Sequence, residues 1–176
     1  MGSAVTVRSP LARRAADLDR VGARELAFLA QVDVRVDPTT AGTLGFPTEP
    51  NTWTPAGDRD VLWLGPDEWL VVADPGGAGA IAEELERSLA DVHRSVVDVS
   101  ANRAVLELSG ASRHDHLSSA CPIDLHPRSW GDGRCAQSVF GAAQVLLQER
   151  KGTTRLFVRP SFAGYVVDLL LAVAPA

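Results

Sequence analysis

The residues with the clearest potential for chemistry are His114, Asp115 and His116, which follow one another in the chain. Ser112 can cap a short helix that would extend to about residue 120. On a helix, side chains two positions apart point to different faces, so the histidines could share a metal ion only if this segment were a strand. The other possible ligands lack Cys-x-x-Cys or His-Glu-x-x-His spacing: His93, Cys121, His126 and Cys135. The sequence therefore predicts no metal site.

No set of catalytic residues emerges from the other polar side chains. Ser118 and Ser119 lie near a histidine but outside a Gly-x-Ser-x-Gly turn. Asp98 and Asp124 would act as general bases only if they were buried, whereas acidic residues beside turns are usually solvated or cap the local backbone. The glycines of 76–79 lack the spacing of a dinucleotide or phosphate loop. We therefore expect no catalytic residues and no cofactor bound by this chain.

Tryptophan is abundant, with four Trp against one Tyr and five Phe. Trp53 lies in a stretch from 38 to 57 that is rich in proline and glycine, which predicts a long ordered loop or a docking surface. Its indole would pack either in the core or against a partner. Arg128 and Trp130 lie in a second turn-rich stretch, and both residue types are enriched at interface hot spots. We take Asn51, Trp53, Arg128 and Trp130 as interface candidates, with packing inside the chain as the alternative.

The elements that would position these residues follow from hydrophobic periodicity. Apolar alternation between turn signals predicts strands at 28–36, 61–64, 69–73, 95–99, 104–108, 135–140, 144–148 and 155–158. The segments 95–99 and 104–108 could be one bent strand or two. Helical spacing predicts helices at 78–90, about 112–120 and 161–173. This order predicts an α+β fold in which helices pack on one face of a largely antiparallel sheet.

Length and composition favour a folded chain with one core. The 176 residues include 45% hydrophobic and 22% charged residues, close to globular averages. We expect an arm or short helix over 1–27 and a single domain over 28–176. The net charge of -5 argues against nucleic acid as a partner. The sequence lacks an apolar run of about 18 residues and a secretory signal, which predicts a cytoplasmic protein, without a membrane segment, whose two cysteines are reduced.

Several segments together resemble the sarcosine oxidase gamma family. The strongest are FPTEPNT at 46–52, LWLGPDEWLV at 62–71 and CPIDLHPR at 121–128. The segments 97–103, 133–137 and 155–159 fit the same family. The resemblance covers roughly residues 46 to 171, and the combination is specific although each segment alone is weak.

This resemblance implies an assembly of alpha, beta, gamma and delta subunits. Such complexes demethylate sarcosine oxidatively to glycine, reduce oxygen to peroxide and pass the one-carbon unit to tetrahydrofolate, forming 5,10-methylenetetrahydrofolate. In that family FAD, FMN, NAD, tetrahydrofolate and zinc belong to the other subunits. The resemblance thus implies that this chain is a non-catalytic assembly subunit.

The family is also similar to the folate-binding aminomethyltransferase domain of the glycine cleavage system. That similarity implies an antiparallel α+β fold of ferredoxin-like character. It brings Asp124 near the acidic residue that contacts folate, although Cys121-Pro122 replaces the usual lead-in and the tyrosine after the turn is absent. Asp124 is therefore the folate candidate of a rival interpretation, a stand-alone folate-binding one-carbon transfer protein. A regulatory homodimer is a further alternative.

Overall fold

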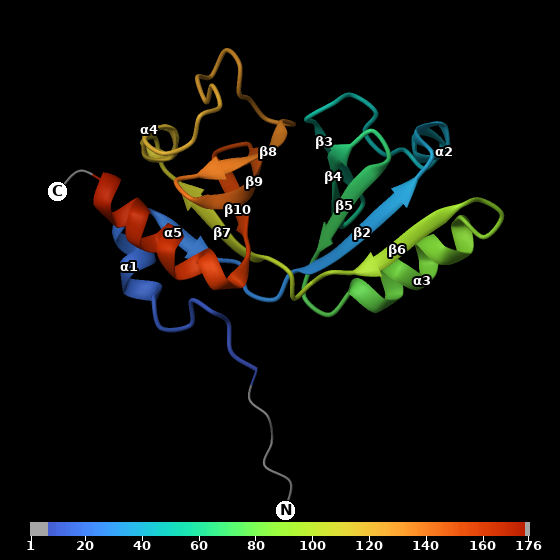
Figure 1. The fold of residues 1–176 in the computed structure, drawn as a ribbon, viewed down its shortest axis with the longest axis horizontal. Helices are drawn as coiled ribbons and strands as arrows, with labels where there is room; N and C mark the ends of the chain where they lie inside the picture. The colour runs from blue at the N-terminus through green and yellow to red at the C-terminus, as the bar shows by residue number, and fades with distance from the viewer. Residues whose placement is uncertain (1–6, 175–176) are drawn as a thin grey trace, which may run out of the picture.

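The computed structural model describes residues 7–174, which form two five-stranded antiparallel sheets with five helices (Figure 1). Sheet A has the order β1-β7-β10-β9-β8, and sheet B has the order β3-β4-β5-β2-β6. In chain order the elements are α1 (Ala15–Arg20), β1 (Ala23–Glu25), β2 (Ala30–Val36), α2 (Pro38–Thr43), β3 (Trp53–Ala56), β4 (Arg59–Gly65), β5 (Glu68–Ala73), α3 (Ala78–Ser88), β6 (Arg94–Asp98), β7 (Ala104–Ser109), α4 (Arg113–Ser118), β8 (Cys135–Phe140), β9 (Ala143–Arg150), β10 (Thr153–Val158) and α5 (Pro160–Val173).

The layers follow the order helix, sheet, sheet, helix. Helices α1, α4 and α5 pack on the outer face of sheet A, where α5 buries Ala163, Val166, Val167 and Leu170 at helical spacing. Helices α2 and α3 pack on the outer face of sheet B, and α3 contributes Ile81 and Leu85. The predicted α+β class with antiparallel strands is confirmed, and the structure divides the strands between two sheets.

A third apolar cluster lies between the inner faces of the two sheets. In β5, Trp69 and Val71 point to the α2–α3 side, whereas Leu70 and Val72 join the inner cluster. Successive side chains of a strand point to opposite faces, so a strand that is covered on both sides reads as a continuous apolar run. The inner cluster continues on sheet A through residues such as Leu146 and Phe157.

The two sheets are connected at two places. Along one edge, Thr52 forms an isolated antiparallel bridge with Arg134, and the N–H of Cys135 donates to the carbonyl of Asn51 at 2.9 Å. At the other place the chain crosses between the sheets twice, through residues 26–29 and 99–103 (Figure 1). The N–H of Val99 donates to the carbonyl of Gln31 at 2.8 Å, which fixes the start of the second crossover to β2.

One segment differs from the sequence predictions, and one alternative that the sequence left open is decided. The stretch 38–57 was expected to be a loop, but it contains α2 and β3. Pro38 begins α2, and the Asp37 carboxylate caps it by accepting from the N–H of Thr39 at 2.9 Å. Pro55 is tolerated in β3 because this strand lies at the edge of sheet B. Segments 95–99 and 104–108 are two strands, β6 and β7, in different sheets.

The N-terminal segment was expected to be an arm or a short helix over 1–27. Residues 1–6 lie outside the described residues, and residues 7–27 contain α1 and β1. Leu11, Leu18 and Val21 are buried in the cluster under sheet A. Among residues 7–174, no helix is both long and apolar enough to cross a membrane.

Candidate functional site

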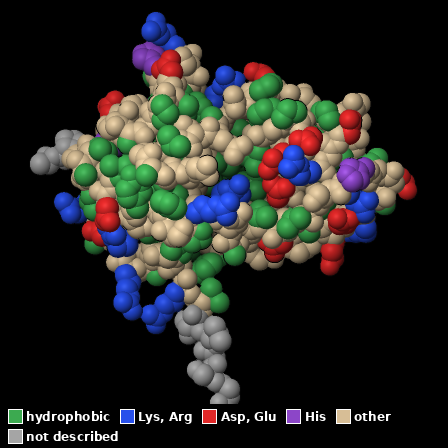
Figure 2. Space-filling view, in the orientation of Figure 1, with side chains coloured by type: hydrophobic (Ala, Val, Ile, Leu, Met, Phe, Trp, Pro, Cys, Tyr) green, Lys and Arg blue, Asp and Glu red, His purple; other side chains and the backbone are tan. Residues whose placement is uncertain are grey.

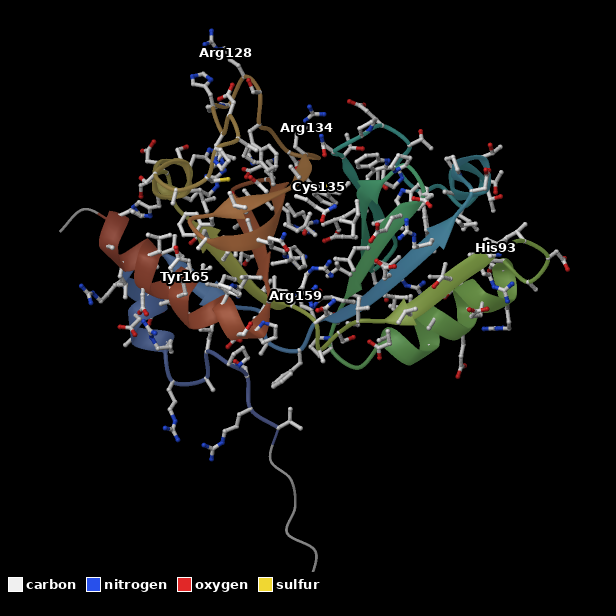
Figure 3. All side chains as sticks on the ribbon, viewed as in Figure 1. His93, Arg128, Arg134, Cys135, Arg159 and Tyr165 are labelled. Carbon is white, nitrogen blue, oxygen red and sulfur yellow. The ribbon has the colours of Figure 1, made fainter. Side chains whose placement is uncertain are left out.

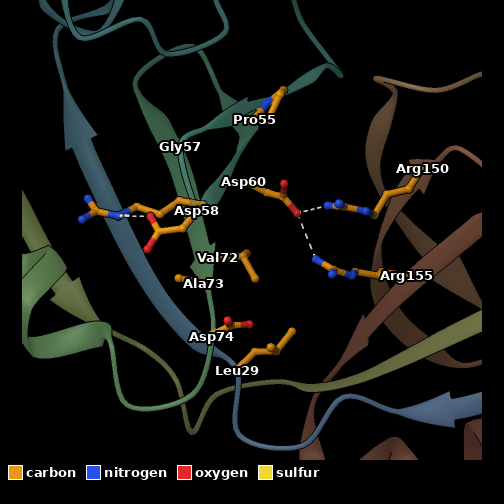
Figure 4. Close-up of a pocket in the computed structure, with 11 residues that line it drawn as sticks. Leu29, Pro55, Gly57, Asp58, Asp60, Val72, Ala73, Asp74, Arg150 and Arg155 are labelled. Carbon is orange, nitrogen blue, oxygen red and sulfur yellow. Dashed lines mark hydrogen bonds and ion pairs between the residues drawn. The ribbon is translucent and has the colours of Figure 1, made fainter.

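A polar cluster interrupts the apolar layer between the two sheets and borders a cavity of about 280 Å³ (Figure 4). Its centre is Asp60 of β4, which points across to sheet A. One oxygen of Asp60, Oδ2, accepts from Arg155 Nη1 at 2.9 Å, from Gln148 Nε2 at 3.0 Å and from Arg150 Nη1. These contacts join β4 directly to β9 and β10.

Strand alternation explains why these groups meet. Asp60 lies two positions before Leu62, and Arg155 lies two positions before Phe157. Leu62 and Phe157 both belong to the inner apolar cluster, so Asp60 and Arg155 point inward as well. Gln148 is the cross-strand partner of Arg155 in the β9–β10 ladder, which puts both side chains on the same face.

The charges at this cluster alternate in sign and compensate one another. Arg155 Nε lies 3.6 Å from Glu107 Oε2, and Glu107 in turn accepts from Arg24 Nη2 at 2.6 Å. Burial lowers the pKa of the Arg155 guanidinium, as does the charge of Arg150, whereas the Asp60 and Glu107 carboxylates act in the opposite direction. Because three arginines and three aspartates line the cavity, the charged lining favours neither anions nor cations. These residues are Asp58, Arg59, Asp60, Asp74, Arg150 and Arg155.

A second polar cluster surrounds Glu149 on the opposite face of β9. This carboxylate is 3% exposed and accepts from Arg113 Nη2 at 2.7 Å, from Trp130 Nε1 at 3.0 Å and from Thr154 Oγ1 at 2.5 Å. His114 Nε2 lies 3.1 Å from the same carboxylate. Since burying an ionised carboxylate is costly unless it is paired and hydrogen-bonded, these contacts are what allows Glu149 to remain in the core.

The four interface candidates lie in two different environments. Trp53 and Trp130 are buried, and both indoles donate hydrogen bonds to Glu149. The backbone carbonyl of Glu149 accepts from Trp53 Nε1 at 2.7 Å, and its carboxylate accepts from Trp130 Nε1. Asn51 is exposed and has a φ of 60°, a conformation that asparagine tolerates better than most residues. Arg128 is exposed at the tip of the loop between α4 and β8 (Figure 3). The structure thus brings the two tryptophans to one cluster and leaves Arg128 apart.

Asp124 lies in the same loop as Arg128, and its carboxylate is used within that loop. It accepts from Ser129 Oγ at 2.6 Å and from the N–H of His126 at 3.0 Å. The hydrogen bond from Ser129, followed by that from His126, holds the pKa of Asp124 below its ordinary value. Asp124 does not line the cavity between the sheets.

The His114–His116 triplet lies on a helix, α4, as predicted. His114 faces Glu149, while His116 is buried. Over residues 7–174, no group of three or more His, Cys, Asp or Glu side chains could hold a metal ion.

The two cysteines, Cys121 and Cys135, are buried free thiols, in agreement with the prediction that they are reduced. Cys135 lies near the junction of the two sheets (Figure 3) and donates to the carbonyl of Thr52 at 3.1 Å. Burial raises the pKa of its thiol to about 12. A thiol that remains protonated in the core has little reactivity as a nucleophile.

Sequence reasoning missed Asp60 and Glu149, the centres of the two polar clusters. Both are charged residues in strands, where a polar residue normally indicates the solvent-facing side. The only signal was the run Gln148-Glu149-Arg150, which places three polar residues on both faces of one strand.

Comparisons with known proteins show the family to which this chain belongs. A model of the sarcosine oxidase gamma subunit family matches residues 31–175. A sarcosine oxidase subunit gamma from Arthrobacter sp. is 42% identical over 146 residues, which cover 78% of this chain and 70% of the relative. This chain belongs to the sarcosine oxidase gamma subunit family.

Solved structures agree with this membership. A chain of the heterotetrameric sarcosine oxidase from Corynebacterium sp. U-96, in complex with pyrrole 2-carboxylate, superposes on this gamma-family chain with a TM-score of 0.85 and 31% identity, covering 95% of this chain and 94% of that one. The glycine cleavage system aminomethyltransferase T from Bartonella henselae has a TM-score of 0.67 at 12% identity, covering 88% of this chain and 48% of that one. At this low identity the second similarity concerns the fold alone.

Proposed function

We propose that this chain is the gamma subunit of a heterotetrameric sarcosine oxidase and that it serves assembly rather than catalysis. The observation that carries the proposal is the superposition on a chain of such a heterotetramer over nearly the full length of both chains. The charged groups of the interior also support it. Asp60 and Glu149 each have three hydrogen-bond donors within the chain, so their capacity is used to hold the fold together.

In this proposal the chemistry belongs to the other subunits. The complex would consist of alpha, beta, gamma and delta subunits in the cytoplasm and would convert sarcosine to glycine with formation of peroxide and 5,10-methylenetetrahydrofolate. FAD, FMN, NAD, tetrahydrofolate and zinc would be bound by the partner subunits. Of the four interface candidates, Asn51 and Arg128 present exposed side chains and are proposed to contact a partner directly. Trp53 and Trp130 would support such a surface from beneath.

The test is to isolate the tagged chain from its native cells and to analyse what accompanies it. We expect larger chains, a yellow flavin absorption and sarcosine-dependent peroxide formation in the recovered material. We also expect the chain to melt at a higher temperature in the complex than alone, because a partner that binds only the folded form stabilises it.

A colourless chain recovered alone would contradict the proposal. If this lone chain bound tetrahydrofolate saturably, and if Asp124→Ala weakened that binding, the stand-alone folate-binding interpretation would replace it.

A further inference from the structure

An apolar groove of about 300 Å³ lies where the chain crosses between the two sheets. We call it the crossover groove. The crossovers contribute Leu26, Phe28, Ala101 and Arg103, and the N-terminal stretch and the start of α5 complete it with Val7 and Pro160. Figure 2 shows basic side chains at the centre of this face, with hydrophobic side chains below them, above the point where the grey N-terminal trace begins. Arg159, labelled in Figure 3, directly precedes Pro160 at the start of α5.

Phe28 is unusual both in its solvent exposure and in its backbone conformation. Its side chain is 52% exposed, although a phenylalanine is normally buried. Its φ is 60°, a left-handed conformation that glycine or asparagine adopts readily and that is an outlier for a bulky residue. Neither the turn nor the core of this chain requires a phenylalanine here. Strain of this kind is typically retained where the side chain has a function.

Arg103 presents the second unusual group of the groove. Its backbone carbonyl is fixed by Gln31 Nε2 at 3.0 Å, and its guanidinium is partly buried. Burial lowers the pKa of this guanidinium, while the Asp33 carboxylate acts in the opposite direction. Among residues 7–174, the guanidinium forms no ion pair and no side-chain hydrogen bond. A partly desolvated charge of this kind is stabilised when a carboxylate reaches it.

The charge of the groove indicates the sign of its occupant. Arg8 and Arg103 line it together with a single acidic residue, Glu25. Glu25 already accepts a hydrogen bond from Ser9 Oγ, so Arg103 is the group that remains available. An occupant that carries an apolar side chain and a carboxylate would cover the ring of Phe28 and neutralise Arg103 at the same time.

We propose that the crossover groove receives a segment of a partner subunit, with an apolar side chain against Phe28 and a carboxylate on Arg103. This inference rests on the proposed function, because it names the partner surface of the same assembly. Since both crossovers line the groove, the bound segment would contact the connections to both sheets. Burial of the Phe28 ring and neutralisation of Arg103 would each strengthen assembly about 10- to 30-fold.

The test compares three variants of the full chain in competition with the wild-type chain for assembly into the complex. Phe28→Gly removes the ring and suits the left-handed backbone, so the isolated variant should melt at or above the wild-type temperature. Arg103→Gln removes the charge and keeps most of the length. Val92→Ser is the control, because Val92 is similarly exposed but precedes His93, which Figure 3 places at the opposite end of sheet B.

We expect Phe28→Gly and Arg103→Gln to lose the competition by about 10- to 30-fold each and Val92→Ser to compete equally. Equal incorporation of all three variants would overturn the groove as a docking site while leaving the proposed function intact. Failure of the wild-type chain to assemble with any larger subunit would instead overturn the proposed function. A concentration-dependent wild-type dimer that Phe28→Gly abolishes would show that a second copy occupies the groove, which would also overturn the proposal.

Discussion

Replacing Asp60 with asparagine removes the negative charge that two arginines of the opposite sheet share. The carboxamide oxygen can still accept from one donor, but its amino group faces the remaining donors of Arg150, Arg155 and Gln148. Breaking a buried ion pair from one side costs about 3 to 5 kcal/mol. The Arg150 side chain is 31% exposed and Arg155 is 17% exposed, so water screens part of this loss and we expect about 3 kcal/mol.

The assay is urea unfolding of the isolated chain followed by tryptophan fluorescence. A loss of about 3 kcal/mol in a chain of this size corresponds to a decrease in melting temperature of about 6 to 12 °C. Asp58→Asn is the matched control, because Asp58 is 87% exposed and lies 3.5 Å from Arg59 at the surface; it should change the free energy of unfolding by less than about 0.5 kcal/mol. The slope of the unfolding free energy against urea should stay constant for both variants. If Asp60→Asn were no more destabilising than Asp58→Asn, the polar cluster would not hold the two sheets together.

Three further predictions concern other buried or half-buried groups. Burial and the nearby Glu68 carboxylate raise the pKa of Asp33 to about 6, so the contribution of this residue to stability is complete below about pH 4 and is lost as the pH rises through 6. Asp33→Asn should therefore increase the free energy of unfolding by about 1 kcal/mol over wild type at pH 8 and change it little at pH 4. Urea unfolding at both pH values measures this difference. Glu149→Gln leaves the half-buried Arg113 without its counter-ion and should cost about 3 kcal/mol in thermal unfolding. Tryptophan fluorescence should also change as the hydrogen bond to Trp130 weakens, and unchanged fluorescence would contradict the role given to this carboxylate. Cys121 and Cys135 should react with an aromatic disulfide reagent at pH 8 only after unfolding, and rapid labelling of the native chain would refute their placement in the core.

Local pattern was sufficient to predict most of the elements. The hairpin of β4 and β5 was predicted because Gly65 and Pro66 separate two short apolar runs. Helix α5 was predicted because its buried residues recur at helical spacing. These signals act over a few residues, and tertiary contacts did not override them.

The division into two sheets could not be read from the same signals. Alternation predicts that β6 and β7 are strands, but the choice of partner strand depends on contacts far apart in sequence, such as Leu156 of β10 opposite Leu106 of β7. The polar clusters escaped notice for the same reason. Glu149 is buried because α4 and the loop that carries Trp130 close over it, and both segments meet it only in the folded chain.

The buried polar clusters are satisfied within the chain, whereas Arg103 and Phe28 at the crossovers remain available to contact a partner. The apolar layer between the sheets is non-directional, whereas the hydrogen bonds of Asp60 and Glu149 require one register of β4, β9 and β10. Inside the sheets, therefore, charge is compensated within the chain. At the crossovers this direct pairing stops. The partly buried Arg103 guanidinium has no direct ion pair among the described residues, although the Asp33 carboxylate acts on it from a distance, and Phe28 keeps a strained, exposed ring. A segment bound there would contact the connections to both sheets, so assembly would stabilise the same arrangement that the internal clusters specify.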